Sequence, residues 1–228
     1  MVDGAVMCAR DIPLCPCTMN EPPKKLVSWK EARAIHRKAI ANKDFDYHID
    51  AWVHFFIDDQ AFDGPDSGIW RKPKQALEII SHFSGVITPD FSSYQDFPES
   101  IRMINLYRAR AFGFWVGMHG VEVCNSIRWG DVETWDACFL GCRQCDPVFV
   151  GVVASNLRNK HAAELFHQGF ARMLEELGPS KVLFYGAPDG PTLSLLSEHG
   201  VGYAIYESDT AKAHRKASER HGAGDSDE

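Results

Sequence analysis

The sequence predicts an α/β protein, a single domain of repeated βα units. Its 228 residues are 45% hydrophobic, which suits one α/β domain with a sizeable core. Short apolar runs alternate at least five times with longer stretches of helical periodicity. Such alternation is typical of right-handed βαβ units with a parallel sheet, and we favour a partial (β/α) barrel over an open doubly wound sheet.

The two ends of the chain differ in composition from its middle. Residues 1–24 are rich in Cys and Pro, which predicts an irregular arm. Residues 25–208 carry the alternating pattern and are expected to form the α/β domain. Residues 209–228 are densely charged and contain almost no large apolar groups, so we expect a flexible tail.

Six apolar runs predict buried strands. Each run is rich in β-branched or aromatic residues and is bounded by Gly, Pro, Asp or Ser. The runs are residues 54–57, 85–88, 121–127, 148–155, 181–186 and 201–207.

Two helices are predicted from spacing and end signals. One begins near Pro98, because proline is favoured in a first helical turn, and continues toward Gly120. The other ends at Gly178, which is followed by a proline. Its apolar residues recur on one face, at Ala162, Phe166, Phe170, Met173, Leu174 and Leu177.

Charge and composition exclude some classes of function. The net charge of -7 gives no general attraction to polyphosphate, so nucleic-acid binding is not indicated. No apolar run approaches the ~18 residues that a membrane span needs, and the amino-terminal segment lacks a basic leader. We therefore expect a cytoplasmic protein without a membrane segment. Seven cysteines without a secretory context predict reduced thiols, and the oligomeric state stays open.

Carboxylates follow two of the predicted strands. Asp58 and Asp59 come after residues 54–57, and Asp90 comes after residues 85–88. In parallel α/β folds, ligands bind beyond the carboxyl ends of the strands, so these three residues are candidate catalytic groups. They could hold a divalent cation or divide into a general acid and a general base. The alternative is that they only cap or turn the chain.

Asn105 and Arg108 lie in an otherwise apolar helical segment. A buried guanidinium is costly unless it is paired, so Arg108 is predicted to bind an anionic part of a substrate, with Asn105 beside it. A structural ion pair between Arg108 and either Asp59 or Asp90 is the alternative.

Three further residues follow the later predicted strands and are expected to bind substrate. Trp129 and Tyr185 would form a wall of the pocket. Ser155 could bind an anion at a helix start, or it could simply be the N-cap of that helix.

The cysteines of CFLGCRQC raise the question of a cluster. Their Cys-x3-Cys-x2-Cys spacing, at Cys138, Cys142 and Cys145, is that of the four-iron cluster of radical enzymes. In those enzymes the cysteine loop follows the first strand, whereas here it follows the third predicted strand. The residue before the last cysteine is Gln144, where an aromatic residue is usual. We favour ordinary thiols over an iron–sulfur cluster.

Zinc is the second alternative for these thiols. Cys142 and Cys145 could pair with Cys8, or with Cys15 and Cys17, in the amino-terminal arm. The usual signal is two Cys-x2-Cys units, and the chain contains one, so zinc is also disfavoured.

Several segments of the chain resemble one family. HFFIDD, GVITPDFSSYQDFP, NLYRARAFG, VVASN, ELFHQGF and PSKVLFYG are similar to the domain-of-unknown-function family DUF4417, over about residues 50–190. The resemblance implies a bacterial, phage or other mobile-element origin and assigns no activity. The cysteines of CFLGCRQC lie outside the family pattern. The region of Trp129 is similar as well, and the other similar stretches contain Asp59, Asp90, Asn105, Arg108, Ser155 and Tyr185.

Three functional hypotheses follow. The first is a small enzyme that performs hydrolysis or group transfer on a sugar, a nucleotide or another anionic metabolite. The second is a phage or mobile-element accessory protein that binds a host partner or nucleic acid without catalysis. The third is an iron–sulfur radical enzyme that uses Cys138, Cys142 and Cys145.

Overall fold

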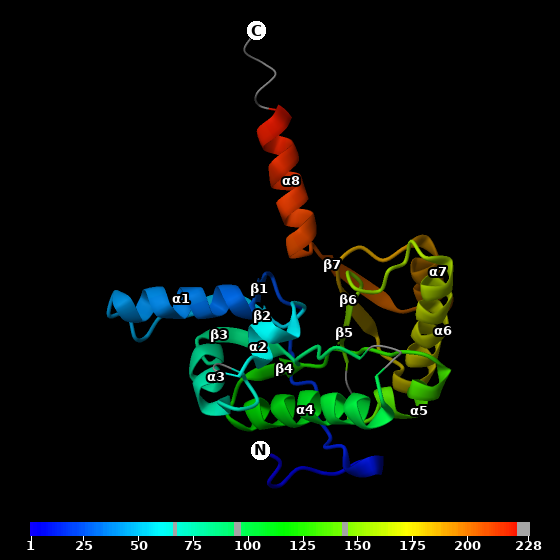
Figure 1. Cartoon of the computed structure of the whole chain (residues 1–228), viewed down its shortest axis with the longest axis horizontal. Coiled ribbons are helices and arrows are strands. Elements are labelled where there is room, and N and C mark those ends of the chain that lie inside the picture. The colour runs from blue at the N-terminus through cyan, green and yellow to red at the C-terminus, as the bar shows by residue number, and fades with distance from the viewer. Residues whose placement is uncertain (66–67, 94–96, 143–145, 223–228) are drawn as a thin grey trace.

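Parallel strands alternate with helices in the computed structural model, as the sequence predicts (Figure 1). The structure describes residues 1–65, 68–93, 97–142 and 146–222. The strands are β1 (Leu26–Ser28), β2 (Ile49–His54), β3 (Phe83–Ile87), β4 (Glu122–Cys124), β5 (Val148–Gly151), β6 (Lys181–Tyr185) and β7 (Gly202–Tyr206).

Each strand pairs in parallel with its neighbour in the chain. One sheet has the order β1-β2-β3-β4 and the other has the order β5-β6-β7. A parallel bridge between Ser126, just beyond β4, and Phe149 in β5 joins them. Backbone hydrogen bonds from Phe149 N to Asn125 O (2.9 Å) and from Ile127 N to Phe149 O (2.8 Å) support this junction. Strand order therefore never reverses within either sheet.

The inner faces of both sheets share one apolar cluster. The hydroxyl of Tyr206 donates to the carbonyl of Pro23 (2.8 Å), which draws β7 toward the segment before β1. The described strand pairing nevertheless stops at β1 and β7, so the partial barrel stays a prediction. Every strand contributes to the cluster, through Leu26, Trp52, Ile87, Cys124, Phe149, Leu183, Ala204 and Tyr206.

Helices cover the outer faces of the two sheets. Among them, α4 runs along the first sheet, and α6 and α7 lie against the second (Figure 1). Ser28 and Glu31 form a capping box that starts α1 directly after β1. The helices are α1 (Trp29–Ala41), α2 (Asp59–Asp63), α3 (Pro73–Ile80), α4 (Glu99–Met118), α5 (Trp135–Cys138), α6 (Lys160–Leu177), α7 (Gly190–Glu198) and α8 (Asp209–Gly222), with 3-10 turns at Ala9–Asp11 and Val132–Thr134.

Most predicted elements are confirmed, and their limits are close. Helix α4 follows Pro98 as its N-cap, and α6 ends at Gly178, which adopts the left-handed conformation with φ of 53°. The strand predicted at residues 54–57 is wrong, because β2 ends at His54. The chain leaves the sheet there but stays in the core, since Phe55 is fully buried.

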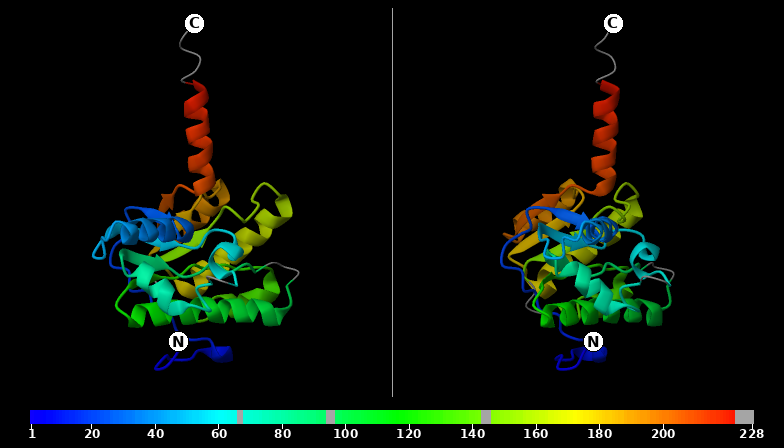
Figure 2. Two further views of the ribbon diagram at one scale, coloured as in Figure 1. Left: turned by 60° about the vertical axis from the view of Figure 1, so that its left-hand side comes forward. Right: turned by 90° about the vertical axis from the view of Figure 1, so that its left-hand side faces the viewer.

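The predicted arm and tail both contain structure. In the arm, Ile12 and Cys15 are buried, so this segment packs against the body. The predicted tail contains helix α8, which projects away from the body (Figure 2). The predicted boundaries of the domain, at residues 25 and 208, stay predictions. In the described part of the chain, no helix combines the length and the apolar character that a membrane span requires.

Candidate functional site

A hollow of about 450 Å³ lies at the carboxyl ends of the strands. Segments that follow β2, β3, β4 and β5 line it, together with Tyr185 at the end of β6, as expected for a parallel fold. Among the predicted site residues, it brings together Asp58, Asp59, Asp90 and Tyr185. Arg128 also lines this hollow and two neighbouring ones, so its guanidinium lies where three hollows meet.

Asp90 and Arg128 form a bidentate ion pair. Arg128 Nε donates to Asp90 Oδ1 (2.9 Å) and Nη2 donates to Oδ2 (2.5 Å), while the hydroxyl of Ser126 adds a bond to Oδ1 (3.3 Å). The Asp90 side chain is 6% exposed and that of Arg128 is 28% exposed. Since β3 and β4 are adjacent and parallel, the residues that follow them meet at one edge. Asp90 therefore fixes the orientation of Arg128.

Asp59 is held by the loop that follows β3. The backbone N–H and the hydroxyl of Ser92 both donate to its carboxylate, at 3.0 to 3.3 Å. Burial raises the pKa of Asp59 above its usual value, and the bonds from Ser92 only partly oppose this shift. Asn105 Nδ2 donates to the carbonyl of Ser92 (2.8 Å), so Asn105 supports the loop that holds Asp59.

Asp58 has a local structural role. It is exposed, and its carboxylate accepts from the N–H of Gln60 (2.9 Å) as the N-cap of α2. This geometry matches the capping alternative, although Asp58 also lies at the rim of the hollow.

Arg108 lies apart from the other predicted residues. It pairs with Asp63, and its guanidinium lies 4.3 Å from the ring centroid of Phe91 and 5.4 Å from that of Trp70. The predicted pairing with Asp59 or Asp90 is wrong, because α2 places Asp63 against α4 and Arg128 already pairs with Asp90. Arg108 lines none of the described hollows that adjoin Arg128.

Trp129 anchors the loop after β4 on helix α6. Its Nε1 donates to the carbonyl of Phe166 (3.1 Å), and its ring packs against Phe170. Gly169 permits this approach, because a Cβ at that position would lie 2.1 Å from Trp129 Cδ1. Trp129 borders the two neighbouring hollows and not the one that contains Asp59.

Ser155 lies in the turn after β5. Its hydroxyl donates to the carbonyl of Gly151 (3.3 Å), and it lines the hollow beside Trp129. The alternative that Ser155 caps the next helix is wrong. Asn159 is the N-cap of α6 and accepts from the N–H of Ala162 (3.1 Å).

Tyr185 forms part of the aromatic wall. Its ring stacks on Phe56, with centroids 4.8 Å apart, and lies 4.5 Å from the ring of His54. The Tyr185 hydroxyl accepts from the N–H of Asp209 (2.9 Å), at the start of α8. Burial raises the pKa of Tyr185, so the ring stays neutral and serves as an apolar surface.

Two of the cysteines of CFLGCRQC lie in the described part of the chain, and neither lines the hollow that contains Asp59. Cys138 and Cys142 are buried in the apolar core beneath α6, and Cys145 lies outside the described residues. Burial raises the pKa of Cys138 to about 12, which disfavours the thiolate that a metal requires. Within the described ranges, no group of three His, Cys, Asp or Glu side chains is arranged to hold a metal ion.

The predictions from sequence missed two residues that complete the site. Arg128 directly follows the strand predicted at residues 121–127, but no role was predicted for it. Asp90, its partner in the structure, likewise follows the strand predicted at residues 85–88. Phe56 was assigned to the strand itself. The signal for Arg128 was the same strand-end rule that selected Asp90.

The fold and this site define an α/β protein of parallel strands with a polar hollow at the strand carboxyl ends. The chain belongs to the family described as "Domain of unknown function (DUF4417)", whose pattern matches residues 6–193. The match includes all the predicted site residues.

Two relatives link the family to bacteriophages. The Gene 1 protein of Mycobacterium phage L5 is 27% identical over 164 residues, which are 72% of this chain and 66% of that protein. The Gene 1 protein of Mycobacterium phage D29 is 28% identical over 165 residues, which are 72% of this chain and 56% of that protein. The chain thus aligns with less than two thirds of the length of either relative.

Proposed function

We propose that this protein is a small enzyme that performs hydrolysis or group transfer on an anionic metabolite containing a ring, such as a sugar or a nucleotide. The observation that carries the proposal is the composition of the hollow at the strand ends. Asp59, Asp90 and Arg128 line one part of it, and Phe56 and Tyr185 line another. Apolar walls with a few convergent polar groups are the usual make-up of a small-molecule site.

Asp59 is the general acid or base in this proposal. Burial raises its pKa above the usual value, which is the direction of shift that favours a carboxyl group as a general acid. Ser92 orients the carboxylate, and Asn105 orients Ser92, so the group is held in place before a substrate binds.

Arg128 binds the anionic part of the substrate. The bidentate pair with Asp90 fixes the guanidinium plane at the edge of the hollow. Asp90 is therefore a positioning residue here. The partly exposed ring of Phe56, which is backed by the buried ring of Tyr185, offers an apolar surface for a sugar or a base.

The test compares turnover of a panel of sugar phosphates, nucleotides and glycosides, followed by mass spectrometry. We expect Asp59→Asn to lower turnover of the active compound by about 10²- to 10⁴-fold, the usual contribution of general acid–base catalysis. The exposed Asp44→Asn, which lines none of the described hollows around Arg128, is the matched control and should retain full activity.

Ligand-induced thermal shifts provide the second measurement. Arg128→Gln should abolish the stabilisation that an active compound gives to the wild type. The catalytic proposal fails if Asp59→Asn keeps full turnover, or if no compound of the panel is turned over or stabilises the protein. The first result would remove Asp59 from the chemistry, and the second would favour the non-enzymatic accessory protein.

A further inference from the structure

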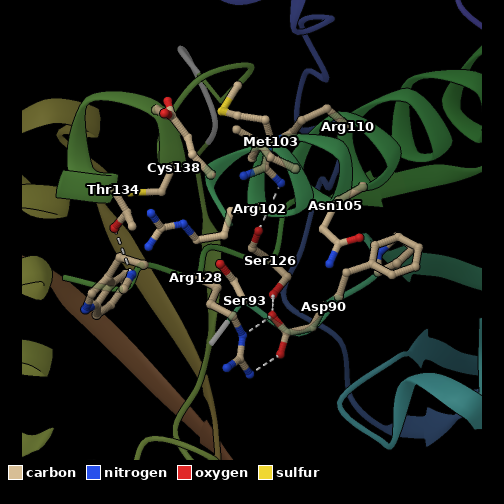
Figure 3. A pocket seen from close by; sticks show the side chains of 18 of the residues that line it. Asp90, Ser93, Arg102, Met103, Asn105, Arg110, Ser126, Arg128, Thr134 and Cys138 are labelled. Carbon is tan, nitrogen blue, oxygen red and sulfur yellow. Dashed lines mark hydrogen bonds and ion pairs between the residues drawn. The ribbon is translucent and has the colours of Figure 1, made fainter. Parts of the chain in front are cut away.

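A second hollow, of about 70 Å³, shares Asp90 and Arg128 with the proposed catalytic hollow. It lies between helix α4 and the segment from Ser126 to Cys138. Figure 3 shows Arg102 and Arg110 extending into this space from α4, above the pair of Asp90 with Arg128. Arg10, Arg102, Arg110 and Arg128 thus all line one small hollow.

Arg110 is buried without a carboxylate partner. Its exposure is 2%, and its Nε donates to the carbonyl of Leu140 (3.2 Å). Its Nη1 donates to the carbonyl of Ser126 (3.0 Å) and to Asn125 Oδ1 (3.4 Å). All these acceptors are neutral, and no ion pair joins Arg110 to a carboxylate within the described ranges. A buried charge without a counter-ion is costly, so an anion beside Arg110 would stabilise it.

Arg102 offers a second donor on the same side. Its side chain is 14% exposed, and its Nη1 lies 3.7 Å from Asp131 Oδ1. Neither of these two buried atoms has a hydrogen-bond partner in the part of the chain that the structure describes. A distance of 3.7 Å is too long for a hydrogen bond, so Arg102 keeps a donor for a ligand.

Asp131 forms a long ion pair with Arg102, whereas the acidic groups that line this hollow pair with neither Arg102 nor Arg110 among the described residues. Glu99 pairs with Arg10 (3.0 Å) at the surface, and Asp90 pairs with Arg128. Glu133 is exposed. Burial raises the pKa of Cys138 to about 12, so its thiol carries no charge near neutral pH.

We propose that this hollow binds a tetrahedral oxyanion, of which phosphate is the representative, through Arg102 and Arg110. A water-sized position needs about 10–15 Å³, so 70 Å³ corresponds to about five to seven such positions, which is room for a small anion such as phosphate. Arginine donors suit phosphate oxygens because their fork geometry matches two oxygens at once. The inference stands whether or not Asp59 is catalytic, since anion binding is measured without turnover.

The test is a calorimetric titration of the full chain with inorganic phosphate, against sodium chloride at equal ionic strength. We expect saturable binding of one phosphate per chain. Arg102→Gln removes one charged donor at the edge of the hollow. A substitution there leaves the core intact, and it should weaken phosphate binding at least about tenfold. The exposed Arg71→Gln is the matched control and should bind as the wild type does.

A second variant separates the two hollows. Asp59 lines only the catalytic hollow, so Asp59→Asn should leave the phosphate affinity within about twofold. Titration with glycerol 3-phosphate shows whether the bound phosphate can be part of a larger molecule. If glycerol 3-phosphate also binds, the site accepts the phosphoryl group of a larger ligand. If it does not bind, the site accepts only the free ion. The proposal is overturned if phosphate gives no saturable binding beyond the chloride control, or if Arg102→Gln binds it as tightly as the wild type.

Discussion

His54, at the end of β2, is a buried imidazole beside the proposed site. It is fully buried, and its Nδ1 accepts from the N–H of Phe56 (3.2 Å). Its Nε2 makes no hydrogen bond to any described residue. Burial lowers the pKa of His54 to about 4; the charge of Lys212 lowers it further, and those of Asp209 and Glu31 partly oppose the shift.

Stability should therefore fall as the pH decreases from about 6.5 to about 4. In that range the unfolded chain binds a proton at His54, whereas the folded chain does not. One pKa unit corresponds to about 1.4 kcal/mol, so the contribution of His54 to the loss is about 3 kcal/mol. Urea denaturation between pH 7 and pH 4 measures the free energy of unfolding directly.

His54→Asn tests this assignment. An asparagine oxygen can replace Nδ1 as the acceptor for Phe56, but it does not titrate, so the pH dependence should become shallower. The exposed His48→Asn should keep the slope of the wild type. An unchanged slope in His54→Asn would mean that other groups cause the loss of stability.

At the scale of single residues, the sequence predicted which residues lie at the strand ends better than it predicted the residues with which they pair. The rule that ligands bind beyond parallel strands selected Asp59 and Asp90, and both line the hollow. The partner of Arg108 was not predictable, because it depends on where the five-residue helix α2 places Asp63. Pairing across a fold requires the distances between elements, and a sequence pattern does not contain them.

Among the elements, helix α4 contains two glycines one turn apart with different surroundings. A Cβ at Gly113 would lie 2.5 Å from Thr88 Cγ2 and 2.6 Å from Cys15 Sγ. A Cβ at Gly117 would meet only Val123 Cγ2, at an ordinary 3.5 Å. Gly113 is thus the point at which the helix, the sheet and the arm approach most closely.

The two alanine variants should change stability in opposite directions. Gly113→Ala overpacks the junction and should lower the free energy of unfolding by about 1–3 kcal/mol. Gly117→Ala should raise it by about 0.5–1 kcal/mol, because alanine loses less conformational entropy in a helix. Thermal and urea unfolding of the two variants provide the comparison. Equal effects would show that helix propensity alone governs both positions.

The first strand and the first helix are among the elements that the sequence did not predict. Strand β1 has only three residues, Leu26–Ser28, so it shows no alternation, and its pairing with β2 determines its conformation. Helix α1 carries a readable signal, since Ser28 and Glu31 match the spacing of a capping box. Longer elements such as α4 and α6 were predicted because their apolar faces repeat over several turns.

At the scale of the whole molecule, the shared interior cluster links the two sheets. Phe149 is fully buried in it, and the backbone of the same residue forms the bridge to Ser126. The two sheets should therefore unfold together and not as separate units.

Phe149→Ala should lower the free energy of unfolding by about 3–5 kcal/mol, as expected for a large buried aromatic side chain. Circular dichroism and tryptophan fluorescence should report coincident transitions in the wild type. Val153→Ala, an exposed apolar residue, is the control and should change stability by less than about 0.5 kcal/mol. Two separate transitions in the wild type would contradict the joint core.

The strict succession of the strands bears on how the chain acquires its structure during translation. Each strand finds its hydrogen-bonding neighbour in the segment synthesised just before it, so no strand has to wait for a distant partner. Contacts between nearby segments favour rapid folding, and nascent chains emerge from the ribosome with the amino-terminal part first. The sheets can therefore grow vectorially, one βα unit at a time, with β7 added last.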